Sequence, residues 1–314
     1  MHVDVDLLEK FENHINPAFP EKSGVPPTIL GYGEISTTFS IDDMPGVAFK
    51  RMPPFDHSDQ IIAYKTALDR YCFLLSDQCH IPVSPYDCYE ITNRFEEKIL
   101  YVAQPLLPKT SIGNYILKNG TLNEMENLVN CVMHHLLSLW QSNHDHLPHE
   151  SIALDGQISN WSFQFKGTDD CDVVYFDITT PMFRINNKDQ LDTEIFLKSC
   201  PSMLTWLVRW QFLQEVLDRY YDTRSVLIDL VANFHKEGRS DLIEGALSVI
   251  NGKVDKNGLI DQIHPLTRSE IDSYYKNDAF IWSLFLSLRR MDRAIKTKIL
   301  RQRYNFILPG RIKR

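Results

Sequence analysis

Residues 31–39 read Gly31-Tyr32-Gly33-Glu34-Ile35-Ser36-Thr37-Thr38-Phe39 and lie between two strand-like runs. Two glycines one residue apart let a β-hairpin turn tightly and let backbone N–H groups approach anionic oxygens. Ser36 stands where a third glycine often occurs, and its hydroxyl can also reach a phosphate. The stretch predicts either a phosphate-binding turn or an ordinary hairpin, in which Gly-x-Gly is common.

A strand-like run that ends in a lysine, Val47-Ala48-Phe49-Lys50, follows this turn. Lys50 comes 19 residues after Gly31. The protein-kinase pattern V-A-I-K places its lysine on the strand after a glycine loop, where it holds the nucleotide's phosphates. Lys50 is therefore a candidate phosphate ligand, and the alternative is a surface lysine at a strand edge.

The third stretch is Leu154-Asp155-Gly156-Gln157-Ile158-Ser159-Asn160, which follows a long apolar helical pattern over residues 123–141. An aspartate five residues before an asparagine recurs in kinase catalytic loops. There the aspartate accepts the proton of the substrate hydroxyl and the asparagine binds a metal ion. The alternative is an Asp-Gly turn with a capping asparagine, which occurs in any class of protein.

The fourth stretch, Val173-Val174-Tyr175-Phe176-Asp177, reads as a buried strand that ends in an acid. Asp177 comes 17 residues after Asn160. A carboxylate at the end of such a strand can bind magnesium, which prefers oxygen ligands and the phosphates of a nucleotide. Each of the four signals is common, but their occurrence in this order is not.

The chain divides near residue 105 into two parts of different composition. Before it, strand-like runs broken by Gly and Pro surround one helical pattern over residues 58–76. After it, the pattern is mostly helical, with a short β-like insert at residues 161–177. We expect a β-rich nucleotide-binding lobe over residues 1–104 and a helical lobe over residues 105–314, which would carry the catalytic loop and the acceptor-binding helices. Ligands often bind in the cleft between two such lobes.

With these four stretches in order, residues 28–220 resemble the protein-kinase-like superfamily, nearest its aminoglycoside- and choline-phosphotransferase branch. The resemblance implies a two-lobed α+β fold, with a small antiparallel β-rich lobe containing one helix and a larger, mostly helical lobe. It also implies that ATP and Mg²⁺ bind between the lobes. Asp155 and Lys50 would be the catalytic residues, and Asn160 and Asp177 would bind the metal.

The resemblance also implies which residues contact the nucleotide. Gly31, Gly33 and Ser36 would lie over it, together with Lys50. The stretch Gln104-Pro105-Leu106 resembles the hinge whose backbone receives the adenine. Asp177-Ile178-Thr179 stands where protein kinases have D-F-G, and no A-P-E segment follows, so the phosphotransferase branch fits better than the protein kinases.

Three departures from the family pattern bear on catalysis. Ala153 stands where the family usually has a histidine, and Leu154 replaces the usual Gly or Arg. The glutamate that normally pairs with the lysine is missing, because no Glu occurs between residues 34 and 90. Asp69, on the predicted helix and 19 residues after Lys50, is the expected substitute.

Charge is distributed unevenly along the 314 residues. The chain is 43% hydrophobic and 24% charged with a net charge of -8, as in ordinary globular proteins. Residues 289–314 contain ten Lys or Arg and a single acid. The acidic remainder argues against a nucleic-acid binder. The basic tail would bind an acidic protein partner, an anionic lipid or the protein's own body, or it is a solvated helix end whose charge suits the helix dipole.

Cysteine usage and hydropathy predict where the protein resides. Its six cysteines include no C-x-x-C pair, which favours reduced thiols in a cytoplasm, either the cell's own or that of a host. The apolar run 279–288 is about half of what a bilayer crossing needs, and the N-terminus lacks the features of a signal peptide. We therefore expect a cytoplasmic protein without a transmembrane segment.

The resulting hypothesis is an ATP- and magnesium-dependent phosphotransferase that acts on a hydroxyl of a small molecule or a protein. Acidic residues after position 188 would favour a cationic acceptor or would simply form a solvated face: Asp189, Asp192, Glu194, Glu215, Asp218 and Asp222. Two alternatives stay open. One is a pseudokinase that acts as a binding or regulatory module through its basic tail, and the other is a kinase-fold enzyme that transfers AMP.

Overall fold

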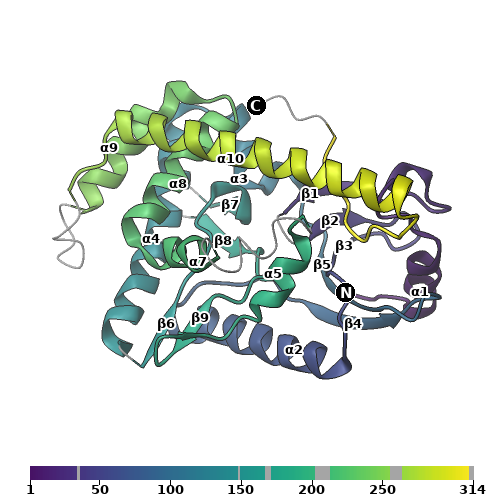
Figure 1. Cartoon of the computed structure of the whole chain (residues 1–314). Helices are drawn as coiled ribbons and strands as arrows, with labels where there is room; N and C mark the ends of the chain where they lie inside the picture. Colours follow the sequence, from purple (N-terminus) through teal and green to yellow (C-terminus); the bar gives the residue numbers. More distant parts are fainter. Residues whose placement is uncertain (34–35, 148, 167–170, 202–212, 255–263, 311–314) are drawn as a thin grey trace.

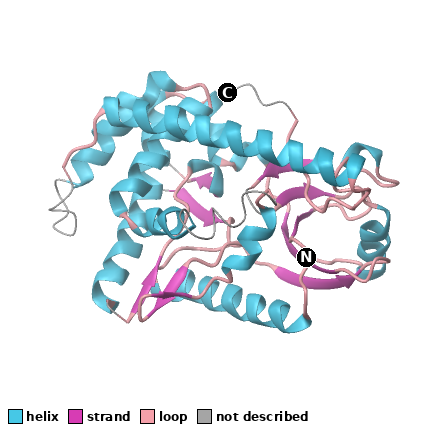
Figure 2. Cartoon of the chain, viewed as in Figure 1, coloured by secondary structure: helices cyan, strands magenta, loops and turns pink. Residues whose placement is uncertain are grey.

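The computed structural model describes residues 1–33, 36–147, 149–166, 171–201, 213–254 and 264–310. Within them, an antiparallel sheet flanked by helices forms one lobe, the N-lobe. A mostly helical body that carries two small antiparallel sheets forms the other, the C-lobe (Figures 1 and 2). The expected two-lobed α+β architecture, with an antiparallel β-rich lobe and a mostly helical lobe, is confirmed.

The N-lobe sheet has the strand order β1-β2-β3-β5-β4. Its strands, and the two helices that pack near them, are β1 (Thr28–Tyr32), β2 (Thr37–Ser40), β3 (Val47–Arg51), β4 (Asp87–Thr92), β5 (Lys98–Pro105), α1 (Val5–His14) and α2 (Ser58–Phe73). All neighbouring strands run antiparallel. The strand-like runs and the helical pattern expected before residue 105 correspond to these strands and to α2, whereas the sequence pattern did not predict α1.

The two faces of this sheet contribute to different cores, because side chains alternate along a strand. Phe39, Phe49 and Tyr101 lie on the outer face, in a core shared with α1. Leu100 and Val102 point the other way and join α2 and the C-lobe in the main core. Lys50 follows Phe49 along β3 and therefore faces the C-lobe.

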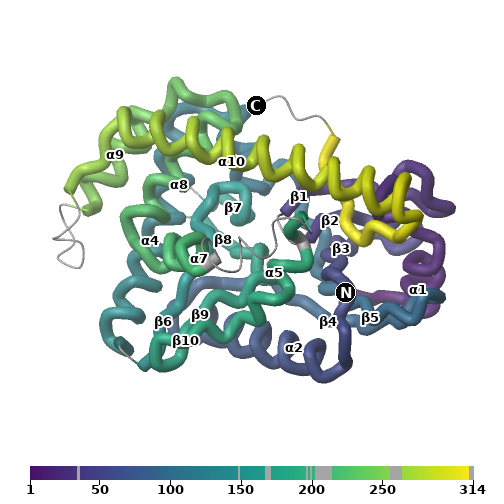
Figure 3. The backbone as a smooth tube through the Cα atoms, viewed as in Figure 1, coloured from purple at the N-terminus to yellow at the C-terminus, as the bar shows by residue number. Residues whose placement is uncertain are grey.

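The C-terminal segment, residues 301–310, packs on the outer face of the N-lobe sheet. The carbonyl of Ile307 accepts a hydrogen bond from Thr37 Oγ1 at 3.2 Å, and its side chain joins the outer core. Figure 3 shows this yellow segment beside the purple N-terminal part of the chain. The division at residue 104 remains a prediction. The last described residues of the second part, 301–310, pack against the first part.

A buried ion cluster fastens this segment to the sheet. Glu12 of α1 is fully buried and accepts hydrogen bonds from Arg51 Nε at 2.7 Å and Arg51 Nη2 at 2.8 Å. Arg303 donates to Glu97 at 2.9 Å and to Glu12 at 3.4 Å. Arg293 donates to the carbonyl of Ala18 at 3.0 Å. These basic residues of the predicted tail therefore bind the protein's own body, whereas an acidic protein partner for the tail remains a prediction.

The C-lobe is built around α4 and α8. Its helices are α3 (Gly113–Asn119), α4 (Leu122–His146), α5 (Thr193–Ser199), α7 (Leu213–Tyr221), α8 (Thr223–Lys236), α9 (Ile243–Val254) and α10 (Arg268–Ala294). Its strands are β6 (Glu150–Ile152), β7 (Trp161–Phe165), β8 (Cys171–Tyr175), β9 (Phe183–Ile185) and β10 (Lys188–Asp189). Capping boxes start α4 at Thr121 and α10 at Thr267.

The sequence pattern around α10 predicts two helices, over residues 268–275 and 278–303. The structure shows one helix over 27 residues, since no Gly or Pro interrupts it. A π-helical turn, η8 (Ile295–Ile299), follows it. The helix runs along the outside of both lobes (Figure 1), so it connects the C-lobe with the surface where the C-terminal segment docks.

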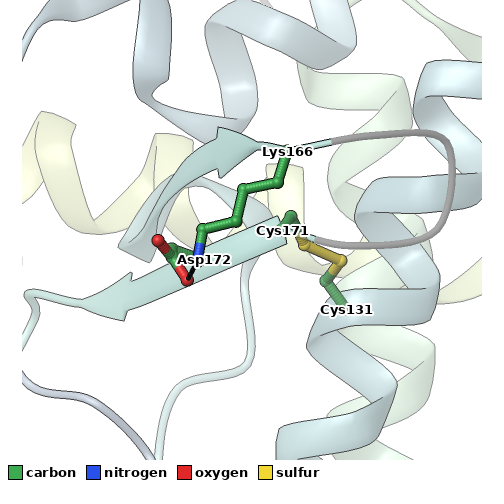
Figure 4. Close-up of a disulfide and its surroundings, with 4 residues drawn as sticks. All are labelled: Cys131, Lys166, Cys171 and Asp172. Carbon is green, nitrogen blue, oxygen red and sulfur yellow. Dashed lines mark ion pairs between the residues drawn. A yellow bond between two sulfur atoms is a disulfide. The ribbon is translucent and has the colours of Figure 1, made fainter.

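A disulfide corrects the expectation that all cysteines are reduced. Cys131 of α4 and Cys171 at the start of β8 are bonded, with their Cα atoms 7.0 Å apart (Figure 4). The neighbouring Asp172 pairs with Lys166 at 2.7 Å. Cys72, Cys79 and Cys88 are free thiols. Sequence spacing did not reveal the pair, because 40 residues separate its members and only the packing of β8 beside α4 brings them together.

Candidate active site

The glycine stretch forms a tight turn between β1 and β2. The N–H of Gly33 donates to the carbonyl of Ser36 at 2.9 Å. A Cβ at position 33 would lie 2.8 Å from that oxygen, so this position requires glycine. A Cβ at Gly31 would meet nothing within 4 Å, which leaves open space beside β1. Glu34 and Ile35 lie outside the described residues.

Lys50 lies on the same row of the sheet as this turn. Gly31 pairs with Thr38, and Thr38 pairs in turn with Lys50. Its side chain is buried, with 6% of the residue exposed, and its ammonium donates to Asp177 Oδ1 at 2.5 Å and to Thr179 Oγ1 at 3.3 Å. The sheet thus presents the lysine to the segment that the sequence reading placed opposite it.

The hairpin of β7 and β8 brings Asn160 and Asp177 to one end. Trp161 pairs with Tyr175, and the N–H of Phe176 donates to the carbonyl of Asn160 at 3.1 Å. The amide nitrogen of Asn160 donates to the carbonyl of Asp155 at 3.2 Å, so its amide oxygen is the group left for a ligand. The register of this hairpin explains how residues 17 positions apart come to share a site.

The donor set at this end of the hairpin suits magnesium. A carboxylate oxygen from Asp177 and an amide oxygen from Asn160 are hard ligands, and a magnesium ion commonly completes its shell with water and nucleotide phosphates. Among the described residues, no group of three or more His, Cys, Asp or Glu side chains could hold a metal by itself. The two oxygen ligands of Asn160 and Asp177 therefore fit part of the shell of a magnesium ion.

Asp155 is held in a compact loop against α8. Its Oδ1 accepts from the N–H of Gln157 at 3.0 Å. A Cβ on Gly156 would lie 2.9 Å from Val226 of α8, so only glycine allows this approach. The preceding Ala153 is fixed by hydrogen bonds, since its carbonyl accepts from the Tyr71 hydroxyl at 2.8 Å and its N–H donates to Met182 at 2.9 Å.

Burial raises the pKa of Asp155, and the neighbouring carboxylates of Asp229 and Asp177 raise it further, to about 8. The charge of Lys236 acts in the opposite direction. A carboxyl group with a pKa in this range is a stronger base than an ordinary aspartate, and general bases work best when their pKa lies near the working pH. The environment of Asp155 therefore matches the role that the sequence reading assigned to it.

Asp229 is a candidate functional residue that the sequence reading missed. It lies on α8, and its Oδ1 accepts from the Tyr274 hydroxyl of α10 at 3.0 Å. Burial raises its pKa, whereas hydrogen bonds from Tyr274 and from the Gln157 side chain lower it. No motif marks this residue. Its only signal is an acid within the apolar stretch of α8, where Leu227, Leu230 and Val231 are buried.

The structure does not place Asp69 beside Lys50. The buried face of α2 consists of Ile61, Tyr64, Leu68, Tyr71 and Cys72, and Asp69 points away from that face. There it accepts from the Tyr86 hydroxyl at 2.6 Å. Tyr64 instead links α2 to the site, because its hydroxyl donates to the carbonyl of Thr179 at 2.7 Å. From α2, therefore, Tyr64 contacts Thr179, which is a hydrogen-bond partner of Lys50, and the expected acidic partner Asp69 does not contact the lysine.

In the expected hinge, the backbone N–H of Leu106 is already hydrogen-bonded, whereas the side-chain nitrogen of Gln104 has no partner in the described residues. The N–H of Leu106 donates to the carbonyl of Gly46 at 2.9 Å, so this N–H is not available to a base. Gln104 pairs with Ala48 of β3, two residues before Lys50, so the side chains of Gln104 and Lys50 lie on the same face of the sheet. Its side-chain nitrogen is buried and has no hydrogen-bond partner in the described part of the chain. Gln104 is therefore the better-placed of the two residues to bind a nucleobase.

Comparisons with known proteins give a family match and three distant structural likenesses. The model of a family described as "Family of unknown function (DUF6206)" matches residues 11–293. No curated protein matches the sequence. Two GDP complexes of aminoglycoside 2′-phosphotransferase-IIIa are similar in structure. A point mutant shares 10% identity over 77% of this chain and 96% of its own, with a TM-score of 0.34. The wild-type enzyme shares 11% sequence identity with this chain. The match covers 88% of this chain and 95% of that one, with a TM-score of 0.35.

A third structure, the GDP and kanamycin complex of APH(2″)-IIIa, shares 12% identity over 80% of this chain and 99% of its own, with a TM-score of 0.28. At these scores the likenesses carry no argument about activity. The chemistry of the site rests on the chain's own side chains.

Proposed function

Because the chain belongs to the DUF6206 family, whose function is unknown, its activity must be inferred from its own side chains, and we propose that it is a kinase-like phosphotransferase. The proposed reaction transfers the terminal phosphoryl group of ATP to a hydroxyl of a small molecule or a protein, with Mg²⁺ as cofactor. The acceptor loses its proton, the bond between the oxygen and the terminal phosphorus forms, and ADP leaves.

The observation that carries this proposal is the meeting of Lys50 and Asp177. Their 2.5 Å contact joins a strand of the N-lobe to the end of the β7–β8 hairpin in the C-lobe. Asn160 lies at the same end of that hairpin and is hydrogen-bonded to the Asp155 loop. A cation, two oxygen ligands and a base are thus within one contact network, which is the set of groups that phosphoryl transfer requires.

Each side chain has a role in the proposed reaction. Lys50 would bind phosphate oxygens and neutralise the charge that develops on them, and the turn at Gly33 would cover them with backbone N–H groups. Asn160 and Asp177 would hold the Mg²⁺ ion, which supplies further positive charge when it is bound. Asp155 would orient the acceptor hydroxyl and accept its proton.

One observation favours a second function, that of a binding module without catalysis. Helix α2 gives Lys50 no acidic partner, because Asp69 is turned away and Tyr64 contacts Thr179 instead. In such a pseudokinase the cleft would still bind a nucleotide, and Asp155 would be dispensable. The two functions differ in whether the removal of Asp155 abolishes an activity.

A thermal-shift titration tests nucleotide binding first. With saturating ATP and Mg²⁺, ligand at about 100 times its dissociation constant would stabilise the wild type by about 2.7 kcal/mol and raise its melting temperature by several degrees. The Asp177→Ala variant should lose the magnesium-dependent part of this shift. Asp172→Ala, an acid of the same hairpin that pairs with Lys166, is the matched control and should keep it. A wild type that responds neither to ATP nor to GTP contradicts the proposal.

Hydrolysis of the bound nucleotide then separates the two functions. Water can replace an unknown acceptor, so a phosphotransferase should show a slow nucleotidase activity. Asp155→Asn should reduce it by about two orders of magnitude, as expected for loss of a general base, while nucleotide binding remains. Binding without any turnover in the wild type would favour the pseudokinase.

A further inference from the structure

The outer side of α10 and the turn that follows it expose a series of large apolar side chains. Their residues are 41% to 72% exposed: Phe280, Ile281, Leu284, Met291, Ile299 and Leu300. Single exposed apolar residues are normal on protein surfaces, but contiguous ones mark binding surfaces. Six of them within 21 residues of one element require an explanation.

Helix geometry places the first members of this series on one stripe. At about 100° per residue, Phe280, Leu284 and Met291 fall within about 40° of one another around the helix axis. Leu286 and Arg289 are buried and lie on the opposite side. Because α10 runs along the outside of both lobes (Figure 1), this stripe faces away from the body. From residue 280 to residue 300 it is about 30 Å long, at about 1.5 Å per residue.

The region from residue 280 to residue 302 exposes two basic residues, Lys298 and Arg301, and no acid. The exposed residues between positions 280 and 302 are Phe280, Ile281, Ser283, Leu284, Ser287, Met291, Lys298, Ile299, Leu300, Arg301 and Gln302. The only acid in this range, Asp292, is buried and pairs with Lys296 at 3.2 Å. In a chain with a net charge of -8, a surface without exposed acids is a local exception.

The basic residues of this region divide into two groups with different surroundings. Arg293 and Arg303 face inward and bind the N-lobe. Lys298 and Arg301 are exposed on either side of Ile299 and Leu300, and they form no ion pair within the described ranges. The inward group explains how the segment is held. The outward group forms no such contact with the N-lobe in the described residues, and its charge matches a negatively charged partner.

We propose that this surface, formed by the outer stripe of α10 and residues 298–301, binds the protein to a membrane that contains anionic phospholipids. Phe280, Leu284, Ile299 and Leu300 would enter the boundary between head groups and acyl chains. Lys298 and Arg301 would contact lipid phosphates. None of the described helices is long and apolar enough to span a membrane. In the proposed contact, α10 would lie on the bilayer surface, as amphipathic helices with basic residues do.

The shape of the surface favours a lipid bilayer over a folded protein partner. Four of the apolar side chains stand on the long helix α10, and Ile299 and Leu300 follow it in the next turn, beside the two exposed cations. Such a surface can sink into a fluid interface along its whole length, and its affinity comes from apolar burial together with attraction to anionic lipid.

Vesicle co-sedimentation of the full-length protein tests the proposal. The wild type should sediment with phosphatidylcholine vesicles that contain about 30 mol % phosphatidylserine and should remain in solution with phosphatidylcholine alone. Each basic residue near such a surface contributes about 1 kcal/mol. Lys298→Glu combined with Arg301→Glu should therefore weaken binding at least about tenfold. Raising the salt from about 0.1 M to about 1 M should weaken binding of the wild type as well.

A second pair of variants tests the apolar part. Phe280→Ser with Leu284→Ser should reduce sedimentation with the anionic vesicles. Ile62→Ser with Phe73→Ser removes two equally exposed apolar side chains from α2 and should have no effect. All four substitutions lie on exposed side chains, so melting temperatures close to that of the wild type would show that the variants are folded.

Three outcomes would overturn the proposal. The first is the absence of sedimentation with anionic vesicles, and the second is equal binding to neutral and anionic vesicles. The third is a dimer in analytical ultracentrifugation that becomes a monomer in the Phe280→Ser, Leu284→Ser variant, because the surface would then be covered by a second copy of the chain. The test does not involve the cleft, so it is independent of the proposed phosphotransferase activity.

Discussion

The ammonium group of Lys50 lies 2.5 Å from the carboxylate of Asp177, although 127 residues separate them in the chain. One comes from β3 of the N-lobe and the other from the segment after β8 in the C-lobe. The contact therefore crosses from one lobe to the other. It positions a cation beside the carboxylate that we propose as a Mg²⁺ ligand, where a nucleotide's phosphates would insert between them.

Replacing Lys50 by methionine should weaken nucleotide binding. The substitution keeps the length of the side chain and removes its charge, so the charge-assisted contact with phosphate is lost. Such contacts contribute about 1.5–3 kcal/mol, which corresponds to a loss of affinity of about 10- to 100-fold. Calorimetric titration with ATP and Mg²⁺ measures it. Lys98→Met on β5 removes a partly exposed lysine of the same sheet and should leave the affinity unchanged.

Glu12→Gln should destabilise the protein strongly. Burial alone raises the pKa of Glu12, but the charge and hydrogen bonds of Arg51, with hydrogen bonds from Asn93 and Tyr101, lower it to about 2. The variant leaves Arg51 buried beside a neutral amide, and breaking a buried pair costs about 3–5 kcal/mol. Urea unfolding at neutral pH measures the loss. Glu90→Gln breaks a partly exposed pair with Lys98 and should cost at most about 1 kcal/mol.

The stability of the wild type and of the Glu12→Gln variant should also depend differently on pH. Because the folded pKa of Glu12 lies below the ordinary value of 4.5, the carboxylate contributes stability above pH 4.5 and loses it as the pH falls toward about 2. The stability difference between wild type and Glu12→Gln should shrink across that range. A difference that stays constant would show that the charge of Glu12 is not what stabilises the cluster.

Asp155 should produce the opposite dependence. Its pKa in the folded protein is raised to about 8, whereas an unfolded aspartate titrates near about 3.9. Between these values the folded state binds more protons than the unfolded state, so this residue makes the protein less stable as the pH rises. Asp155→Asn should therefore gain stability relative to the wild type from pH 5 to pH 8. A difference in unfolding free energy between Asp155→Asn and the wild type that stays constant from pH 5 to pH 8 would contradict the raised pKa.

Removal of residues 301–314 should damage the N-lobe. The deletion uncovers the outer sheet face and takes away the buried side chains of Tyr304, Ile307 and Leu308. Burial of one such side chain contributes about 1.5–3 kcal/mol, so we expect a loss of at least about 3 kcal/mol. Residues 305–307 also line a small cavity together with Gly33, Ser36 and Thr37, and nucleotide affinity should fall too. A chain that ends at residue 310 is the control and should behave as the wild type.

The sequence predicted the parts of the site that depend on local order along the chain. Turn glycines, a lysine at a strand end and an acid after a buried strand each follow from neighbouring residues. The two-lobed fold also predicts that these residues meet between the lobes. The register of β7 with β8 then brings Asn160 and Asp177 together, which agrees with the pairing that the motifs suggested.

The remaining features depend on packing between distant segments, which leaves no local pattern. Asp229 approaches Asp155 only because Gly156 lets the loop touch α8. Asp69 and Tyr64 differ in orientation because of the phase of α2, which an amphipathic pattern locates only approximately. The bond between Cys131 and Cys171 depends on how β8 lies against α4.

The docking of the C-terminal segment has a consequence for the order in which the protein matures. The N-lobe sheet is built from residues 28–105, yet Ile307 completes its outer core and Arg303 completes its ion cluster. A ribosome synthesises the chain from the N-terminus, so the N-lobe emerges first. Its outer core and its ion cluster are completed only after residues 303–307 have been made. Loss of residues 301–310 would therefore leave the N-lobe without part of its outer core and of its ion cluster.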